Sequence, residues 1–194
     1  MPHCNWVDIR KLSSVGEVYS EKRKAEKLRP TTDFMENASW KGAWKGISFG
    51  LASGVITTLG MMVGIDATTN SKLAVLASIL AIAIADSFSD SVGIHISEES
   101  EGKNPKEVWT ATLFTLISKF TFAMSFTIPV LLLDLSEAIV ASVLWGFALI
   151  AGFSYFNARQ NRRNPAKEVA ENTGIAMAVI TVTYIAGKTL ARLY

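Results

Sequence analysis

Five long apolar runs, separated by short polar segments, constrain this chain of 194 residues more than any other feature of its sequence. A helix of roughly 20 residues crosses the ~30 Å hydrocarbon core of a bilayer, and each run approaches or exceeds that length. The sequence therefore predicts an all-α integral membrane protein with five transmembrane helices. We expect these helices to cover about residues 47–65, 73–94, 109–133, 138–156 and 174–190.

The composition supports this class and excludes several others. Charged residues make up 19% of the chain and hydrophobic residues 49%, which excludes an intrinsically disordered protein. The net charge of +2 excludes a nucleic-acid binder with a dominant basic surface. The single cysteine, Cys4, excludes an internal disulfide. Phosphate-loop, zinc-protease and serine-nucleophile motifs do not occur in the sequence, so we expect neither an enzyme nor a resident cofactor.

Lysine and arginine are distributed unevenly among the connecting segments. If the N-terminus is inside, the inner segments collect 15 of these residues and the outer segments collect 3. The positive-inside rule then predicts a cytoplasmic N-terminus, and an odd number of spans puts the C-terminus outside. The chain is polar for over forty residues before the first apolar run, so we expect no cleavable signal. The expected location is a prokaryotic cytoplasmic membrane.

Residues 1–39 differ in character from the five-helix domain expected at 40–194. Apolar residues recur at helical spacing between Trp6 and Tyr19, a pattern typical of an amphipathic helix lying on the cytoplasmic membrane surface. A binding arm for another protein is the alternative interpretation. Trp40 and Trp44 then lie where interfacial aromatic residues are expected.

The first apolar run has glycine at every fourth position, at Gly46, Gly50 and Gly54. This spacing places the three glycines on one helix face, where they permit another helix to approach closely. The partner is either a helix of the same subunit or a second subunit of a homodimer. Met61 and Met62 follow on the same run, and their thioethers either pack against neighbours or bind a soft metal ion.

The second run contains two aspartates, Asp86 and Asp90, one helical turn apart and on one face of the helix. A carboxylate at this depth costs at least a few kcal/mol, so it must be paired, protonated or exposed to water. Lys119 lies about 15 Å into the third run, and its long side chain can reach the level of Asp86. Either Asp86 and Lys119 form a buried structural pair, or the two aspartates alternately hold a cation and a proton while Lys119 serves as counter-charge.

An acidic segment follows the second run at its cytoplasmic end. It contains one imidazole and three carboxylates, a donor set that suits a hydrated divalent ion such as Fe²⁺ or Mn²⁺. The alternative is an ordinary solvated acidic loop. Below two membrane aspartates, such a cluster would concentrate cations at the mouth of a pathway. The residues are His95, Glu98, Glu99 and Glu101.

Two stretches of the first and second runs carry a family resemblance. Residues 46–64 read Gly-Ile-Ser-Phe-Gly-Leu-Ala-Ser-Gly-Val-Ile-Thr-Thr-Leu-Gly-Met-Met-Val-Gly, and residues 85–101 read Ala-Asp-Ser-Phe-Ser-Asp-Ser-Val-Gly-Ile-His-Ile-Ser-Glu-Glu-Ser-Glu. Both stretches resemble the vacuolar iron transporter family, particularly its short prokaryotic branch. The resemblance extends over about residues 45–190 and implies a dimeric five-helix transporter that moves Fe²⁺ or Mn²⁺ out of the cytoplasm in exchange for protons.

This sequence departs from that family at the acidic positions. Better-known members have Ser-Asp-Gly-Leu in the first span, whereas residues 48–51 here read Ser-Phe-Gly-Leu. Those members have a Ser-Met pair and then Gly-Glu-Tyr in the second span, and the matching positions here are 89–90, Ser-Asp, and 93–95, Gly-Ile-His. The acids of this chain are therefore relocated, and both Asp86 and Asp90 lie in the second span.

These observations lead to two functional hypotheses. The first is a homodimeric, proton-coupled transporter for a divalent transition metal, whose partners are the lipid bilayer, the metal ion and protons, with no nucleic acid. Its metal-handling residues would be the two membrane aspartates, the four residues of the cytoplasmic mouth and the two methionines. The second hypothesis is a membrane scaffold or adaptor that transports nothing and uses Asp86 and Lys119 as a structural pair.

Overall fold

The computed structural model describes residues 31–193, with side chains from Ser39 onward. The amphipathic helix expected within residues 1–39 lies outside the described residues, apart from the start of α2. The chain divides after Ala38, and the unit Ser39–Tyr194 contains all five apolar segments.

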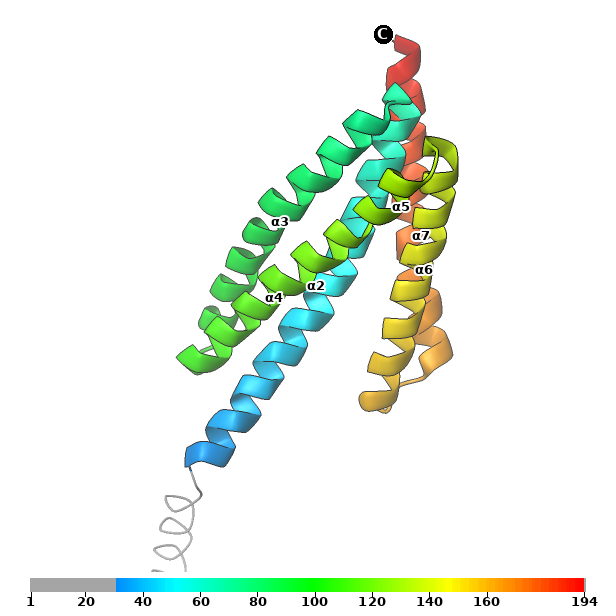
Figure 1. Cartoon of the computed structure of the whole chain (residues 1–194). Helices are drawn as coiled ribbons and strands as arrows, with labels where there is room; N and C mark the ends of the chain where they lie inside the picture. Colours follow the sequence, from blue (N-terminus) through cyan, green and yellow to red (C-terminus); the bar gives the residue numbers. More distant parts are fainter. Residues whose placement is uncertain (1–30, 194) are drawn as a thin grey trace, which may run out of the picture. The chain divides into compact units, whose positions relative to one another are not determined.

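Six helices, with no strand among the described residues, make up the fold (Figure 1). Five helical segments are long and apolar enough to cross a membrane, which confirms the predicted all-α class and the number of apolar helices. Each is longer than the apolar run it contains, because the polar residues at its ends continue the helix. The helices are α2 (Thr31–Thr69), α3 (Lys72–Ser100), α4 (Pro105–Ser125), α5 (Thr127–Leu132), α6 (Leu135–Gln160) and α7 (Pro165–Leu193).

The third apolar run is divided into α4 and α5 at Phe126. Pro129 explains the position of this break. Its ring lacks an N–H and would clash with the carbonyl of Ser125, four residues earlier, if the helix continued. The Phe126 N–H instead bonds to the carbonyl of Ala123, at 3.2 Å, and the Phe126 side chain is fully buried.

Two helical hairpins, α3–α4 and α6–α7, close through turns with the same hydrogen bonds. In each turn the sixth residue donates to the first, Lys103 N to Glu98 O at 3.3 Å and Arg163 N to Ala158 O at 2.9 Å. Each turn then continues with Asn-Pro, which begins the next helix. Both turns lie at the same end of the bundle, and we call this the basic end because residues 101–106 and 161–167 contribute five lysines and arginines there.

Helix α2 lies between the two hairpins and contacts both (Figure 1). The buried share of the apolar segment is 56% for α2 and 11–28% for the other four segments. Leu59 and Val55 pack over Gly146 of α6, and Gly64 lies against Thr183 of α7. The outer faces of α3 to α7 expose many large apolar side chains, as expected of helices that face lipid.

The glycine face of α2 contacts α4 of the same chain. A Cβ on Gly42 would lie 2.6 Å from the Glu107 carbonyl oxygen, and one on Gly46 would lie 2.8 Å from the Thr115 amide nitrogen. A Cβ on Gly54 would lie 3.1 Å from the Lys119 carbonyl oxygen. Of the two predicted partners for this face, the described structure therefore shows a helix of the same subunit.

This packing predicts that Gly46→Ala destabilises the protein by about 1–3 kcal/mol, because the added methyl meets backbone atoms of α4 that cannot move independently. The measurement is the thermal unfolding midpoint in detergent, followed by circular dichroism. Gly152→Ala is the matched control, since a Cβ at Gly152 of α6 meets nothing within 4 Å. Equal midpoints for the two variants would contradict the close α2–α4 contact.

Candidate functional site

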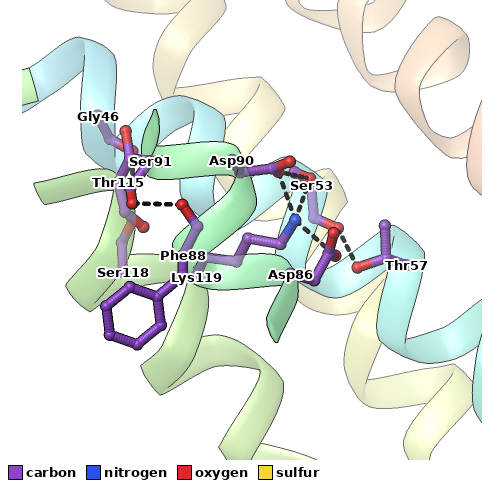
Figure 2. Close-up of polar contacts among 10 residues, drawn as sticks. All are labelled: Gly46, Ser53, Thr57, Asp86, Phe88, Asp90, Ser91, Thr115, Ser118 and Lys119. Atoms are coloured by element: carbon purple, nitrogen blue, oxygen red, sulfur yellow. Dashed lines mark hydrogen bonds and ion pairs between the residues drawn. The ribbon is translucent and has the colours of Figure 1, made fainter. Parts of the chain in front are cut away.

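A buried lysine forms the centre of the polar contacts within the membrane segments. Lys119 is fully buried, and its Nζ lies 2.6 Å from Asp86 Oδ2 and within hydrogen-bonding distance of Asp90 Oδ2. It also donates to Ser53 Oγ at 2.9 Å. Figure 2 shows the ammonium group between the two carboxylates, with Ser53 beside them. We call Asp86, Asp90 and Lys119 the charged triad.

Three helices place these groups together. Asp86 and Asp90 lie one turn apart on α3, Lys119 comes from α4, and Ser53 comes from α2. Gly54 of α2 makes room for the lysine, because a Cβ at that position would lie 3.2 Å from Lys119 Cγ. The glycine pattern and the buried charge are therefore parts of one arrangement.

The two carboxylates are less buried than the lysine. The exposed fractions of their side chains are 32% for Asp86 and 23% for Asp90, compared with 0% for Lys119. Asp90 also accepts a hydrogen bond from Ser53 Oγ at 2.7 Å, whereas the contact of Asp86 with Lys119 is an ion pair without an aligned hydrogen bond. Two carboxylates and one ammonium carry a formal charge of about −1, so one further positive charge is needed for neutrality.

A groove runs beside the triad, between α2, α3 and α7. Its volume is about 940 Å³, and it is lined mostly by apolar atoms. Asp86 and Ser89 of α3 reach it, as do Thr57 and Met61 of α2 and Thr183 of α7. The groove therefore brings a carboxylate, hydroxyls and a thioether to one surface at the level of the membrane.

The two adjacent methionines have different positions. Met61 is 41% exposed and lines the groove together with Asp86. Met62 is buried in the hydrophobic core with Val55 and Leu59. Of the two predicted thioether ligands, Met61 lines the same groove as a carboxylate and Met62 does not.

The imidazole of the predicted cytoplasmic mouth is fixed by α4. His95 Nδ1 lies 3.0 Å from Thr112 Oγ1, and the ring meets the edge of Trp109 at 4.7 Å between centroids. The Thr112 hydroxyl donates its proton to the Val108 carbonyl at 2.8 Å, so we infer that Nδ1 carries the imidazole proton and donates it to Thr112. This leaves the Nε2 lone pair available.

The carboxylates of the mouth are divided among different partners. Glu98 is almost fully buried and pairs with Lys45 of α2, while Glu101 lies 3.7 Å from Lys45 and 3.8 Å from Lys103. Glu99 is exposed. Among the described residues, no three His, Cys, Asp or Glu side chains form a group that could hold a metal ion. The structure therefore brings together the triad but does not bring the four mouth residues into one cluster.

Sequence reasoning missed two residues of these contacts, Ser53 and Lys45. Ser53 and Thr57 are polar residues four apart on an otherwise apolar helix, and Thr57 donates to the Ser53 carbonyl at 2.9 Å. That spacing was the available signal for a polar stripe on α2 facing the aspartates. Lys45 had no comparable signal, because its position before the first apolar run is also where a solvated lysine is expected.

Comparisons of the chain with protein-family models, with curated proteins and with solved structures find no match. The chemistry of the site is therefore the basis for assigning a function.

The geometry predicts that Lys119→Met destabilises the protein by about 3 kcal/mol, because it leaves two neighbouring carboxylates without their buried counter-charge. The double variant Lys119→Met with Asp90→Asn is expected to recover part of this loss, since the repulsion between carboxylates disappears. Unfolding midpoints of the two variants and of Asp90→Asn alone measure the coupling. Lys106→Met, at an exposed lysine of α4, is the control and should leave the midpoint unchanged. Additive effects of the two triad substitutions would contradict a direct interaction.

Proposed function

We propose that this protein is a membrane transporter that exchanges a divalent transition-metal ion, Fe²⁺ or Mn²⁺, for protons, exports the metal from the cytoplasm and acts as a homodimer. The observation that carries the proposal is the charged triad, because it combines a buried counter-charge with two partly exposed carboxylates, one of which, Asp86, lines the groove. Intramembrane ionisable groups of this kind mark ion pathways in membrane proteins.

The charge of the triad supports coupling to protons. At a formal charge of −1, the site is neutralised by one proton or one monovalent cation, and a divalent ion makes it positive. Metal binding at such a site therefore favours the release of protons, as it does wherever the ligands are protonated in the empty state. A proton gradient can then drive the metal across the membrane.

The groove supports a transition metal as the substrate. Magnesium and calcium prefer oxygen ligands alone, whereas softer ions accept a thioether. Met61 and Asp86 line the same groove, with the hydroxyl of Thr57. These donors favour Fe²⁺ or Mn²⁺ over Mg²⁺, and Mn²⁺ is the harder of the two transition metals.

An exposed face of α3 supports the homodimer. Small residues recur on it at every fourth position, and each is exposed in the single chain: Ala77, Ala81, Ala85, Ser89 and Gly93. Such a face permits close contact with another helix. Asp86 and Asp90 adjoin this face, and partly exposed carboxylates within a membrane need protein or water beside them rather than lipid. A second copy of α3 would provide that cover.

A scaffold without transport is the second candidate function. The full burial of Lys119 and its contacts with three helices also suit a purely structural pair that holds α2, α3 and α4 together. In that case a metal ion neither binds nor moves, and the function lies in recruitment of a partner by residues 1–39.

Metal flux into proteoliposomes distinguishes the two functions. We expect uptake of Fe²⁺ and Mn²⁺, measured with an internal metal-quenched dye, to fall at least tenfold (about 1.4 kcal/mol) in Asp86→Asn and in Asp90→Asn. A pH-sensitive dye should report protons moving in the opposite direction. Glu137→Gln, an exposed carboxylate of α6 outside the triad, should retain the flux. Undiminished flux in both aspartate variants would refute the assigned roles, and absence of flux from the parent chain would favour the scaffold.

The homodimer predicts that Gly93→Cys cross-links between two chains under mild oxidation. The substitution is made with Cys4→Ser, so that no other cysteine is present. Val140→Cys in the same background is the control, because Val140 is 61% exposed on α6, away from the small-residue face. The yield of covalent dimer on a non-reducing gel is the readout. Equal cross-linking at both positions would argue against the α3 interface.

A further inference from the structure

A second cavity, distinct from the groove, lies where α2 and α6 meet the basic end of the bundle. Its volume is about 460 Å³. Trp40, Lys41 and Lys45 line it from the first turns of the membrane segment of α2, while Asn157 and Gln160 line it from the last turn of α6. We call it the boundary pocket, because it lies near the start of the apolar segment of α2 and the end of that of α6.

The charge of the boundary pocket is positive. Two lysines line it, and no aspartate or glutamate does. Lys45 is already paired with Glu98 and lies near Glu101, so its charge is largely compensated. Lys41 is exposed, and it is the lysine of the pocket that an incoming anion would meet.

The apolar wall of the pocket is aromatic. Trp40 stacks on Trp44 with 6.3 Å between ring centroids, and Trp44 in turn packs against Phe153 and Phe156 at 5.8 and 5.6 Å. Trp40 remains 64% exposed. Phe49 lines the pocket on the side nearer the membrane centre and is 40% exposed. Indole rings at the membrane edge prefer a position with one apolar and one polar side.

Amide groups complete the polar side. Gln160 is exposed at the end of α6, and the Asn161 amide donates both to the Asn157 carbonyl at 2.9 Å and to Asn157 Oδ1 at 3.0 Å. An amide NH₂ has two donors, so those of Asn161 are used within the pair, whereas those of Asn157 make no hydrogen bond to another described residue. Lysine and amide donors beside an aromatic wall suit a group with a phosphate at one end and an apolar tail at the other.

We propose that the boundary pocket binds the headgroup of an anionic phospholipid. The Lys41 ammonium and the Gln160 amide donate to the phosphate, and the rings of Trp40, Trp44 and Phe49 contact the glycerol and the upper part of an acyl chain. A soluble phosphate would make the polar contacts with Lys41 and Gln160 but not the contacts with the aromatic rings. The position of the pocket at the membrane edge favours the lipid, because anionic headgroups are concentrated there.

Lipid titration of the full-length protein in zwitterionic nanodiscs tests this site. Phosphatidylglycerol should raise the thermal unfolding midpoint, and added phosphatidylcholine should not, because a ligand of the folded state stabilises it. Lys41→Gln should weaken the apparent phosphatidylglycerol affinity about fivefold, as expected for loss of one lysine contact. Lys106→Gln is the matched control, since Lys106 is an exposed lysine at the same end of the bundle that does not line the pocket.

Three results would overturn the proposal. Equal weakening in Lys41→Gln and Lys106→Gln would mean attraction to the whole basic end rather than to a site. An unchanged affinity in Lys41→Gln would remove the pocket from lipid binding. Stabilisation of the same size by soluble glycerol phosphate would assign the pocket to a free phosphate instead.

A second measurement uses tryptophan fluorescence to test whether lipid contacts the aromatic wall, and it does not depend on the stability of the protein. Phosphatidylglycerol with bromine on its acyl chains should quench tryptophan fluorescence more strongly than brominated phosphatidylcholine at equal mole fraction. The excess quenching should disappear in Trp40→Phe with Trp44→Phe, and it should persist in Trp145→Phe, whose ring lies outside the pocket on α6. Excess quenching that survives the loss of Trp40 and Trp44 would place the lipid elsewhere.

Discussion

The buried ammonium group of Lys119 is the interaction on which the rest of the polar structure depends. A fully buried lysine is costly in any protein, and within apolar membrane segments it persists only with a carboxylate nearby. Here Asp86 and Asp90 both provide one, and Ser53 satisfies a further donor. Since these groups come from α2, α3 and α4, one charge determines which faces of three helices must meet. The remaining helices pack through the apolar core, to which α5, α6 and α7 contribute Val130, Ile150 and Ala176.

The sequence predicted the fold class and the five spans because hydropathy reports burial in lipid directly, residue by residue. It also placed Asp86, Asp90 and Lys119 at compatible depths, since helical rise converts sequence position into height. It named Asp86 as the partner of Lys119 and did not predict the contact with Asp90, because depth leaves the rotation of each helix undetermined. In the structure Lys119 contacts both aspartates.

The acidic segment predicted to form a cytoplasmic mouth shows where sequence spacing is insufficient. His95 and Glu99 share a helix face by spacing, as do Glu98 and Glu101, but side chains on α2 and α4 intervene. Glu98 forms an ion pair with Lys45, and His95 forms a hydrogen bond with Thr112. A helical face predicts which residues of one element lie together. Competition from neighbouring elements for their hydrogen bonds can be read only from the packed structure.

The two contacts of α2 with the α3–α4 hairpin differ in their balance of shape and charge. Against α4, glycines allow backbone to approach backbone, and this packing depends on shape and dispersion, while Lys119 adds a charged hydrogen bond to Ser53. Against α3, the polar contacts are Lys45 with Glu98 and Ser53 with Asp90, and both involve a charged group. A change of charge at the triad therefore acts on the α2–α3 contact and on the hydrogen bond between Ser53 and Lys119, whereas the glycine packing against α4 does not depend on charge. The groove, which is walled by α2 and α3 together with α7, lies on the side of α2 where that charge-dependent contact is made.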